Sequence, residues 1–283
     1  MIKKATSVAF FVYNGKQSVY NTTERGDVTV EEYEYHINLT KKDGAKYVIM
    51  PGDPGRTEEI AAYIDDAKEL AFNREFRTFR GYIEGEPVLA VSSGIGGPSA
   101  AICMEELVHI GADTFIRIGT CGGMQMDVDP GDLIIATGAI RMDGTSKEYM
   151  PIEFPAVANL DVTNAIVESA KKLGYKYHVG IVQAKDSFYG QQNPDSMGVD
   201  YELKNKWNAW IRGGCLASEM ESATMFVISS LRNLRAGAVF HCVWNQEQAK
   251  KSMPQERELD TNSAIETAVE AVRLLIKSDK AKQ

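Results

Sequence analysis

Short apolar runs alternate with amphipathic segments along most of this chain. Residues 47–50 (YVIM) form a four-residue apolar run, which is typical of a buried strand. Residues 56–70 have apolar positions at helical spacing, with acidic residues early, where they complement a helix dipole. Residues 81–93 alternate around a Gly-Glu-Pro turn and predict a hairpin. This order of strand, loop, helix and hairpin indicates an α/β fold.

The alternation continues to the C-terminus. Pro98 stands at the first position of a predicted helix that ends just before Gly111, as proline and glycine do at real helix ends. Residues 114–123 (TFIRIGTCGG) predict a strand that runs into a glycine turn. Further strands are predicted at 131–140, 177–188 and 236–244, and further helices near 162–173, 220–232 and 262–277. Such alternation predicts a mostly parallel or mixed sheet covered by helices on both faces.

The pattern predicts one domain. No repeat, linker or low-complexity tract interrupts residues 36–283, so a single α/β domain is the simplest interpretation. Residues 1–35 are polar and aromatic-rich without a clear period, and we assign them to an N-terminal extension.

Composition and charge exclude several classes of protein. The 283 residues are 44% hydrophobic and 25% charged, as in an ordinary globular protein, and the net charge of -8 with scattered basic residues argues against nucleic-acid binding. The cysteines stand alone at positions 103, 121, 215 and 242, which predicts reduced thiols in the cytoplasm. We expect neither a signal peptide nor a membrane span, since no cleavage site and no long apolar stretch are present.

Candidate phosphate ligands follow two of the predicted strands. In open α/β sheets the ligand lies beyond the carboxyl ends of the strands. Residues 52–56 (GDPGR) offer backbone N–H groups, a helix dipole and the Arg56 guanidinium to an anion, although an ordinary turn with a solvated arginine is the alternative. Arg117 lies inside an apolar strand, where it needs a carboxylate or an anionic ligand. Together the two arginines could form a phosphate clamp.

Two later loops carry groups that suit a sugar and a base. Glu219 and Glu221 are two residues apart, so both reach one ligand only if a strand or loop carries them. There they could accept hydrogen bonds from sugar hydroxyls, and a helix N-terminus with acidic residues is the alternative. Residues 186–192 (DSFYGQQ) combine aromatic rings with primary amides, which suits a planar, hydrogen-bonding base, although surface loops also carry such residues.

Taken in order, motifs from about His36 to the C-terminus resemble the nucleoside phosphorylase family, and within it the uridine phosphorylase branch. The motifs are HINLTK, MPGDPGR, NREF, SSGIGGPSAAI with EEL, FIRIGTCGGMQ, FPAVANLDVT, DSFYGQ and ASEMESATMF. The resemblance implies a mixed, partly barrel-like sheet flanked by helices. It also implies cleavage of a nucleoside by inorganic phosphate to a free base and ribose 1-phosphate, with phosphate as co-substrate and no cofactor.

The resemblance further implies three groups of site residues. The phosphate ligands would be Gly52, Arg56, Arg74, Arg117 and Thr120. The ribose ligands would be His36, Thr120, Met220 and Glu221. The residues around the base would be Phe188, Gln191, Gln192, Gly122, Glu219 and Asn245. Arg117 and Glu221 are the residues expected to be catalytic.

An oligomer with shared sites is also implied. Members of this branch are hexamers built as trimers of dimers, and each dimer shares two sites. Arg74 and His36 would therefore reach into the site of the neighbouring subunit. Glu75 and Ser99 match positions that hold a structural monovalent cation such as K⁺ at the dimer interface in some members. That cation has no catalytic part.

The base is the least determined part of the substrate. The uridine enzymes follow the base-binding glutamine with an arginine, which is missing after Gln191 and Gln192 here; Lys185 is the nearest cation and is expected to be solvated. Asn245 stands where related purine enzymes have a proton-donating aspartate, and an amide cannot donate that proton. We expect uridine as substrate, with 2'-deoxyuridine or thymidine as poorer ones. A purine nucleoside phosphorylase, a hydrolytic nucleosidase and a non-catalytic nucleoside-binding protein are the alternatives.

Overall fold

The strand β8 (Thr114–Gly123) lies at the centre of the main sheet in the computed structural model, which describes residues 11–13, 16–22 and 28–282. Residues 114–119 are buried, as expected of a strand that is covered on both faces. Its parallel neighbours are β4 and β13. The strands of this sheet are β4 (Tyr47–Met50), β5 (Asp65–Asn73), β6 (Phe76–Ile83), β7 (Glu86–Val91), β8, β9 (Leu133–Met142), β10 (Ala156–Val157), β11 (Tyr177–Lys185), β12 (Ala217–Glu219) and β13 (Arg235–Asn245).

Part of this sheet closes into a barrel. β8 pairs with β13, β13 with β9, β9 with β11, β11 with β12, and β12 again with β8. Within this ring the β13–β9 and β12–β8 pairs are antiparallel and the other pairs are parallel. The strands β4, β7, β6 and β5 continue from β8 as an open extension. The prediction of a mixed, partly barrel-like sheet is confirmed.

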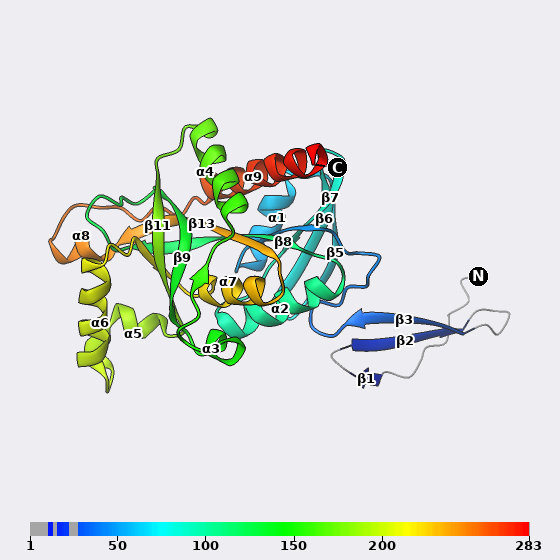
Figure 1. Cartoon of the computed structure of the whole chain (residues 1–283), viewed down its shortest axis with the longest axis horizontal. Helices are drawn as coiled ribbons and strands as arrows, with labels where there is room; N and C mark the ends of the chain where they lie inside the picture. The colour runs from blue at the N-terminus through cyan, green and yellow to red at the C-terminus, as the bar shows by residue number, and fades with distance from the viewer. Residues whose placement is uncertain (1–10, 14–15, 23–27, 283) are drawn as a thin grey trace.

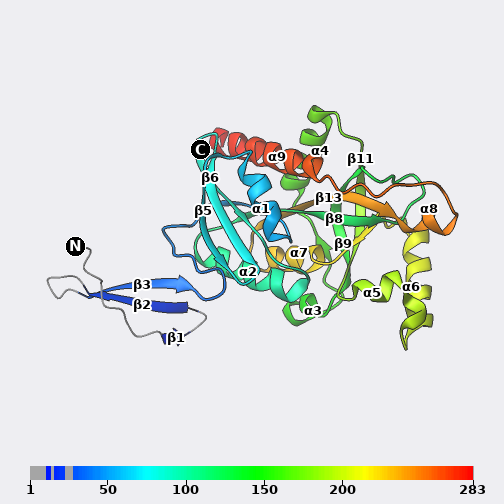
Figure 2. The same cartoon turned by 180° about the vertical axis from the view of Figure 1, so that it is seen from behind.

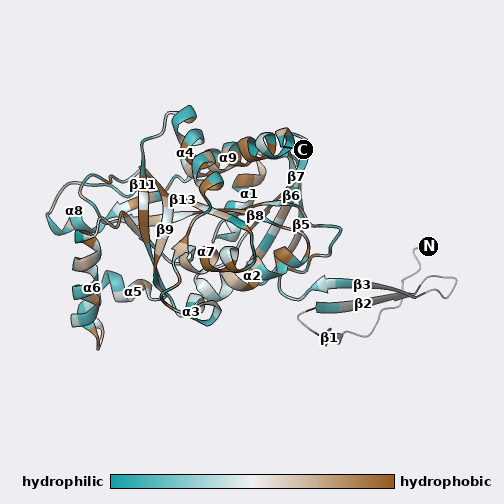
Figure 3. Cartoon of the chain, viewed as in Figure 1, coloured by the Kyte–Doolittle hydropathy of each residue, from teal (hydrophilic) through white to brown (hydrophobic). Residues whose placement is uncertain are grey.

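Helices cover both faces of the sheet (Figures 1 and 2). One layer contains α1, α4 and α9, and its core includes Ile166 and Val272. The other contains α2, α3 and α7, with Met104 and Phe226 in its core. Figure 3 shows the resulting apolar and polar sides of α9. The helices are α1 (Pro54–Ala61), α2 (Gly97–His109), α3 (Thr145–Tyr149), α4 (Leu160–Leu173), α5 (Phe188–Gln192), α6 (Asp200–Arg212), α7 (Ser222–Leu231), α8 (Gln246–Lys250) and α9 (Asn262–Ala281), with a 3₁₀ turn at Pro194–Ser196.

Local signals explain where several helices begin and end. Pro98 lies in the first turn of α2, and Gly111 follows its end with a φ of 112°, so this helix prediction is confirmed. The side chain of Asn159 accepts the N–H of Val162 and caps α4. Gly174, in the left-handed region, ends the same helix.

The predicted helix over residues 56–70 is wrong in its second half. The helix α1 ends at Ala61, and the chain then forms the edge strand β5, which pairs with β6. Gly81 of β6 permits this close crossing, because a Cβ there would lie 2.5 Å from Ile64 and 2.6 Å from the carbonyl oxygen of Asp65. Sheet pairing therefore overrides a weak helical pattern. The helices α3, α5, α6 and α8 lie where the sequence pattern predicted none.

The described residues before His36 form a small sheet of their own. Its antiparallel strands are β1 (Phe11–Tyr13), β2 (Lys16–Thr22) and β3 (Val28–Glu34). It extends away from the main body in Figure 1. Buried Glu34, at its end, contacts His109 of α2, with 3.1 Å between Oε2 and Nδ1. The predicted domain boundary at residue 36 stays a prediction. Among the described residues, no helix is long and apolar enough to cross a membrane.

Candidate active site

A cavity of about 1020 Å³ opens where β4, β8, β11, β12 and β13 end. This is the position that the strand-end rule predicts for a ligand. The predicted site residues that line it are Gly52, Arg56, Glu75, Ser99, Arg117, Thr120, Gly122, Phe188, Gln191, Gln192, Glu219, Met220 and Glu221. The predicted site residues that do not line it are His36, Arg74 and Asn245.

Arg117 is a buried cation on the wall of this cavity. It comes from the middle of β8 and is 4% exposed. Its Nη2 donates to Glu221 Oε2 at 2.5 Å, and its Nη1 donates to Ser93 Oγ at 2.9 Å. Its Nε is buried without a hydrogen-bond partner among the described residues. The sequence analysis expected Arg117 to need either a carboxylate or an anionic ligand. The structure shows the carboxylate, and Arg117 also faces a cavity in which an anion could bind.

Arg56 faces the same cavity from the first turn of α1. It forms no ion pair with a carboxylate in the described part of the chain, and its Nε is buried without a partner. Burial lowers the pKa of Arg56; nearby Asp53 opposes this shift, and the positive charge of Arg117 adds to it. Arg56 thus faces the cavity without a direct carboxylate partner among the described residues, whereas Arg117 is paired with Glu221. An anion such as phosphate would supply the partner that Arg56 lacks.

Glycines allow the chain to approach Arg117 closely. A Cβ on Gly52 would lie 3.2 Å from Arg117 Nη2 and 3.2 Å from the carbonyl oxygen of Gly94. Gly94 has a φ of 68°, and a Cβ there would lie 2.7 Å from Ser99 Oγ. Thr120, near the end of β8, is exposed to the cavity. Backbone and hydroxyl groups therefore surround the two guanidinium groups.

The two nearby carboxylates have different tasks. Glu219 ends β12, and its Oε2 accepts the N–H of Glu221 at 2.8 Å and of Ser222 at 3.0 Å, which caps α7. Burial, followed by the charge of Glu221, raises the pKa of Glu219. Glu221 Oε1 accepts the N–H of Gly96 at 2.7 Å, while Oε2 binds Arg117. Glu219 ends β12 and Glu221 directly precedes α7, so the strand carries only one of the two carboxylates, and the first turn of α7 contains no acidic residue.

The other end of the cavity is rich in amides. Gln191 Oε1 lies 2.5 Å from Ser218 Oγ, and Gln191 Nε2 donates to Gln246 Oε1 at 3.1 Å. Gln192 is exposed, and Phe188 is half exposed at the cavity wall. An aromatic ring and primary amides therefore lie together, as the segment 186–192 suggested. They sit on the short helix α5.

Two polar side chains of β11 lie at or behind this end: Lys185 lines this cavity, and Gln183, which the sequence analysis did not name, lines the neighbouring one. Gln183 and Lys185 are two residues apart on β11 and so share one face of the strand. Lys185 Nζ donates to Ser218 Oγ at 2.6 Å, and the same hydroxyl lies 2.5 Å from Gln183 Oε1. Lys185 is 5% exposed, and burial lowers its pKa to about 8. The expectation that Lys185 is solvated is wrong; the polar alternation just before the loop at 186 was the signal.

The side chain of Asn245 forms hydrogen bonds with backbone groups and does not line the cavity. Its Oδ1 accepts the N–H groups of Glu247 and Gln248 at 2.9 Å, so it caps α8. Its Nδ2 donates to two backbone carbonyl oxygens at 2.7 Å. The paired residues Trp244 and Gly122 line the cavity instead.

His36 and Arg74 lie together outside the cavity of their own chain. His36 Nδ1 is 2.5 Å from Glu106 Oε1, and Asn73 donates to the His36 carbonyl oxygen at 2.7 Å. Arg74 is exposed, and its guanidinium lies 5.7 Å from the ring centre of Tyr35. The structure thus brings these two predicted ligands into one surface group and does not bring them to the arginines inside.

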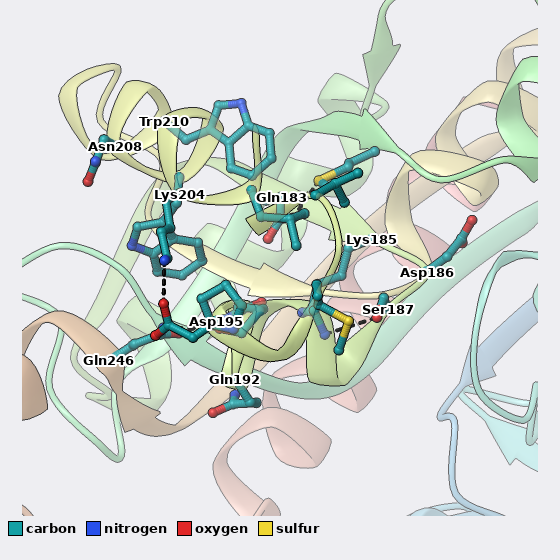
Figure 4. A pocket seen from close by; sticks show the side chains of 18 of the residues that line it. Gln183, Lys185, Asp186, Ser187, Gln192, Asp195, Lys204, Asn208, Trp210 and Gln246 are labelled. Carbon is teal, nitrogen blue, oxygen red and sulfur yellow. Dashed lines mark hydrogen bonds and ion pairs between the residues drawn. The ribbon is translucent and has the colours of Figure 1, made fainter. Parts of the chain in front are cut away.

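A second cavity, of about 770 Å³, adjoins the amide-rich end (Figure 4). Its wall includes Trp207 and Trp210 of α6. Lys185, Gln191, Gln192 and Trp244 line both cavities. In Figure 4 Lys185 lies close to Gln183 and Ser187 at the second cavity. Polar side chains therefore separate the amide-rich end of the first cavity from a partly aromatic second cavity.

The cavity combines two guanidinium groups with polar and aromatic side chains, and it lies on a sheet with a closed barrel. Residues 46–277 match the family model described as the phosphorylase superfamily, and the chain belongs to this family. A uridine phosphorylase of Treponema pallidum is 50% identical, covering 87% of this chain and 95% of the relative. One of Thermococcus kodakarensis is 43% identical, covering 90% and 91%. A guanosine phosphorylase of Halorubrum lacusprofundi is 36% identical, covering 85% and 98%.

The unpaired Arg56 generates a prediction about phosphate. We expect Arg56→Gln to weaken phosphate binding about 10- to 100-fold, the range expected from one charge-assisted hydrogen bond. Its thermal stability should change little, because Arg56 has no protein carboxylate to leave unpaired in the described chain. Isothermal titration calorimetry with phosphate measures the affinity. The exposed Arg212→Gln on α6 is the matched control. Unchanged affinity in Arg56→Gln would contradict the anion site.

Proposed function

We propose that this protein catalyses the phosphorolysis of uridine to uracil and ribose 1-phosphate, a pentosyltransferase reaction of pyrimidine salvage. The observation that carries the proposal is the convergence of Arg56 and Arg117 on a cavity whose other end holds Phe188 and Gln191. The names of relatives that are 43% and 50% identical support the choice of uridine. 2'-Deoxyuridine and thymidine are proposed as poorer substrates.

The mechanism follows from where charge develops. In the transition state the ribose becomes positive and the departing base negative. A phosphate oxygen forms a bond to the anomeric carbon while the carbon–nitrogen bond breaks, and the anomeric configuration inverts. Arg56 and Arg117 would hold the phosphate, with Thr120 beside it, and positioning of this kind contributes up to about 7–11 kcal/mol. Glu221 and the Met220 backbone would hold the ribose 2'- and 3'-hydroxyls.

Phosphorolysis of a purine nucleoside is the second candidate. The guanosine phosphorylase relative favours it, because the same phosphate and ribose residues would serve either base. Uridine is preferred because Asn245 carries no acidic proton, and its amide is already bound by the backbone.

The proposed reaction predicts release of uracil from uridine that depends on phosphate. We expect this release to exceed that from inosine, guanosine or adenosine, and 2'-deoxyuridine and thymidine to react more slowly than uridine. Incubation with each nucleoside, with and without phosphate, followed by chromatography of the free base, measures it. Equal release without phosphate would indicate hydrolysis, and faster cleavage of a purine nucleoside would overturn the choice of base.

We also propose that two chains share each site, in a homohexamer made of three dimers. His36 and Arg74 do not line the cavity of their own chain, which supports the proposal that they enter that of a neighbour. Two large apolar side chains, Phe72 beside Arg74 and Ile95 at the cavity rim, are 57% and 77% exposed. Such exposed apolar groups suit burial against a second copy.

A shared site predicts complementation between two inactive variants. Arg56→Ala and Arg74→Ala should each be nearly inactive. When they are co-expressed, half of the dimers are mixed and each has one intact site, so about a quarter of the wild-type activity should return. Activity of the purified mixture, with its mass from analytical ultracentrifugation, provides the measurement. No recovery in mixed oligomers, or a monomer in solution, would contradict the shared site.

We further propose a structural K⁺ ion near Glu75 and Ser99. Ser99 Oγ lies 2.8 Å from Glu75 Oε1 and 2.6 Å from the Ser93 carbonyl oxygen, so three oxygens converge at the cavity rim. Oxygen ligands suit a hard cation, and a second chain could supply the rest.

The proposed cation predicts a stability effect. In a buffer without alkali ions, added KCl should raise the melting temperature of the wild type through binding. The rise should be lost in Glu75→Gln, whereas tetramethylammonium chloride, the control for ionic strength, should give no rise. Differential scanning calorimetry records both. Equal responses in the variant and the wild type would contradict the site.

A cytoplasmic location is proposed as well. The cysteines at 103, 121, 215 and 242 are buried and form no disulfide, as in proteins of reducing compartments. Recovery of the protein from a secreted fraction would contradict this location.

A further inference from the structure

Lys185 is a buried cation that is affected by the charges of Glu219 and Glu221 but forms no direct ion pair with either of them. It is the last residue of β11, and its Nζ donates to Ser218 Oγ at 2.6 Å and to the Glu219 carbonyl oxygen at 3.4 Å. It forms no ion pair with any carboxylate in the described ranges. An ammonium group has three donors, so one remains beyond these two contacts. Lys185 lines the proposed active cavity at its base end and also the cavity behind it (Figure 4).

Such a charge is costly for the fold. A buried ammonium without a paired carboxylate loses its hydration and gains no ion pair in return. Holding β11 against β12 does not require the charge, because these strands already pair through Val182, Gln183 and Ala184. The burial of this charge without a direct ion pair is therefore best explained by a partner that becomes negative during the reaction.

The departing base is such a partner. We propose that Lys185 is a catalytic residue that donates a hydrogen bond to a carbonyl oxygen of the base and stabilises the negative charge that develops there. This proposal rests on the proposed phosphorolysis. The carbon–nitrogen bond breaks, its electron pair moves to the base, and the charge spreads to the carbonyl oxygens while Lys185 keeps its proton. Donors fixed in advance at the place where charge develops are the most effective form of electrostatic catalysis.

Neighbouring polar groups hold Lys185 in place. Ser218 Oγ accepts from Lys185 and lies 2.5 Å from both Gln183 Oε1 and Gln191 Oε1. The side-chain amide of Gln191 in turn donates a hydrogen bond to the side chain of Gln246 on α8. Because these contacts come from three different elements besides β11, Lys185 has little freedom to turn away from the cavity. The arrangement is preorganised before any substrate binds.

Charged and titratable groups surround Lys185 from several elements. Glu219 from β12, Glu221 from the start of α7 and Cys121 from β8 favour its protonated form, and burial opposes them more strongly, which lowers its pKa to about 8. Asp186, its neighbour in the chain, is exposed and accepts the Gly144 N–H. The ammonium is therefore present below about pH 8 and is lost as pH rises through that value.

The test compares substrates whose bases differ in how well they carry negative charge. Lys185→Met keeps the length of the side chain without its charge, and Lys185→Arg keeps the charge. Lys172→Met, on the exposed face of α4, is the matched control. For each protein, kcat/KM is measured with uridine and with 5-fluorouridine, whose base anion is more stable. Melting temperatures are measured in parallel.

We expect kcat/KM for uridine to fall about 10- to 100-fold in Lys185→Met, the range for a lost hydrogen bond to a charged group. The loss with 5-fluorouridine should be several-fold smaller, and Lys185→Arg should recover part of the activity. The melting temperature of Lys185→Met should not fall, because an unpaired buried charge is removed. In the wild type, kcat/KM should decrease as pH rises through about 8, a decrease absent from Lys185→Met.

Equal losses for both substrates together with a lower melting temperature would show that Lys185 only joins β11 to β12, and would overturn the proposal. Activity of Lys185→Met within two-fold of the control would also overturn it. If Lys185→Met fails to fold, the proposal is still tested by two measurements. They are the pH dependence of kcat/KM in the wild type, and kcat/KM of Lys185→Arg with uridine and with 5-fluorouridine. Failure of the wild type to release uracil with phosphate would instead refute the proposed reaction.

Discussion

The contact between Arg117 and Glu221 is the interaction on which the rest of the site depends. It joins the centre of β8 to the start of α7, and the other oxygen of Glu221 holds the N–H of Gly96 at the start of α2. Both charges are buried, so either one alone would be strongly destabilising, and together they fix three elements around one point. Gly52 and Gly94 can then approach the guanidinium group, which shapes the anion end of the cavity.

The charges along the cavity match the proposed reaction in order. Arg56 and Arg117 stand at one end, where phosphate would bind, and Lys185 stands at the other, where the base would leave. The sugar would lie between them beside Glu221. Each of these cations is partly or wholly removed from water, which strengthens its field at the reacting atoms and makes it costly for stability. The site therefore holds two cations without a direct carboxylate partner in the described chain, Arg56 and Lys185, and their proposed partners are phosphate and the departing base.

In the proposed oligomer the site of one chain would be incomplete. His36 and Arg74 lie outside the cavity of their own chain, and exposed Phe72 is two residues before Arg74. A neighbouring copy would cover this apolar surface and receive the two polar side chains in its own cavity. Assembly and completion of the site would then be the same event, which explains why a single chain places two proposed ligands away from the other site residues.

The sequence alone determined the α/β class, the strands β4, β8, β11 and β13, the helix α2, and the loops that carry the anion and base groups, because periodicity and helix-end residues are local signals. Only the tertiary structure decided that residues 65–73 form an edge strand, since pairing with β6 overrides a weak helical pattern. It also decided the tasks of Asn245 and Lys185. The Asn245 amide is hydrogen-bonded to the backbone around α8, and Lys185 is buried without a direct ion pair, because elements distant in sequence surround them.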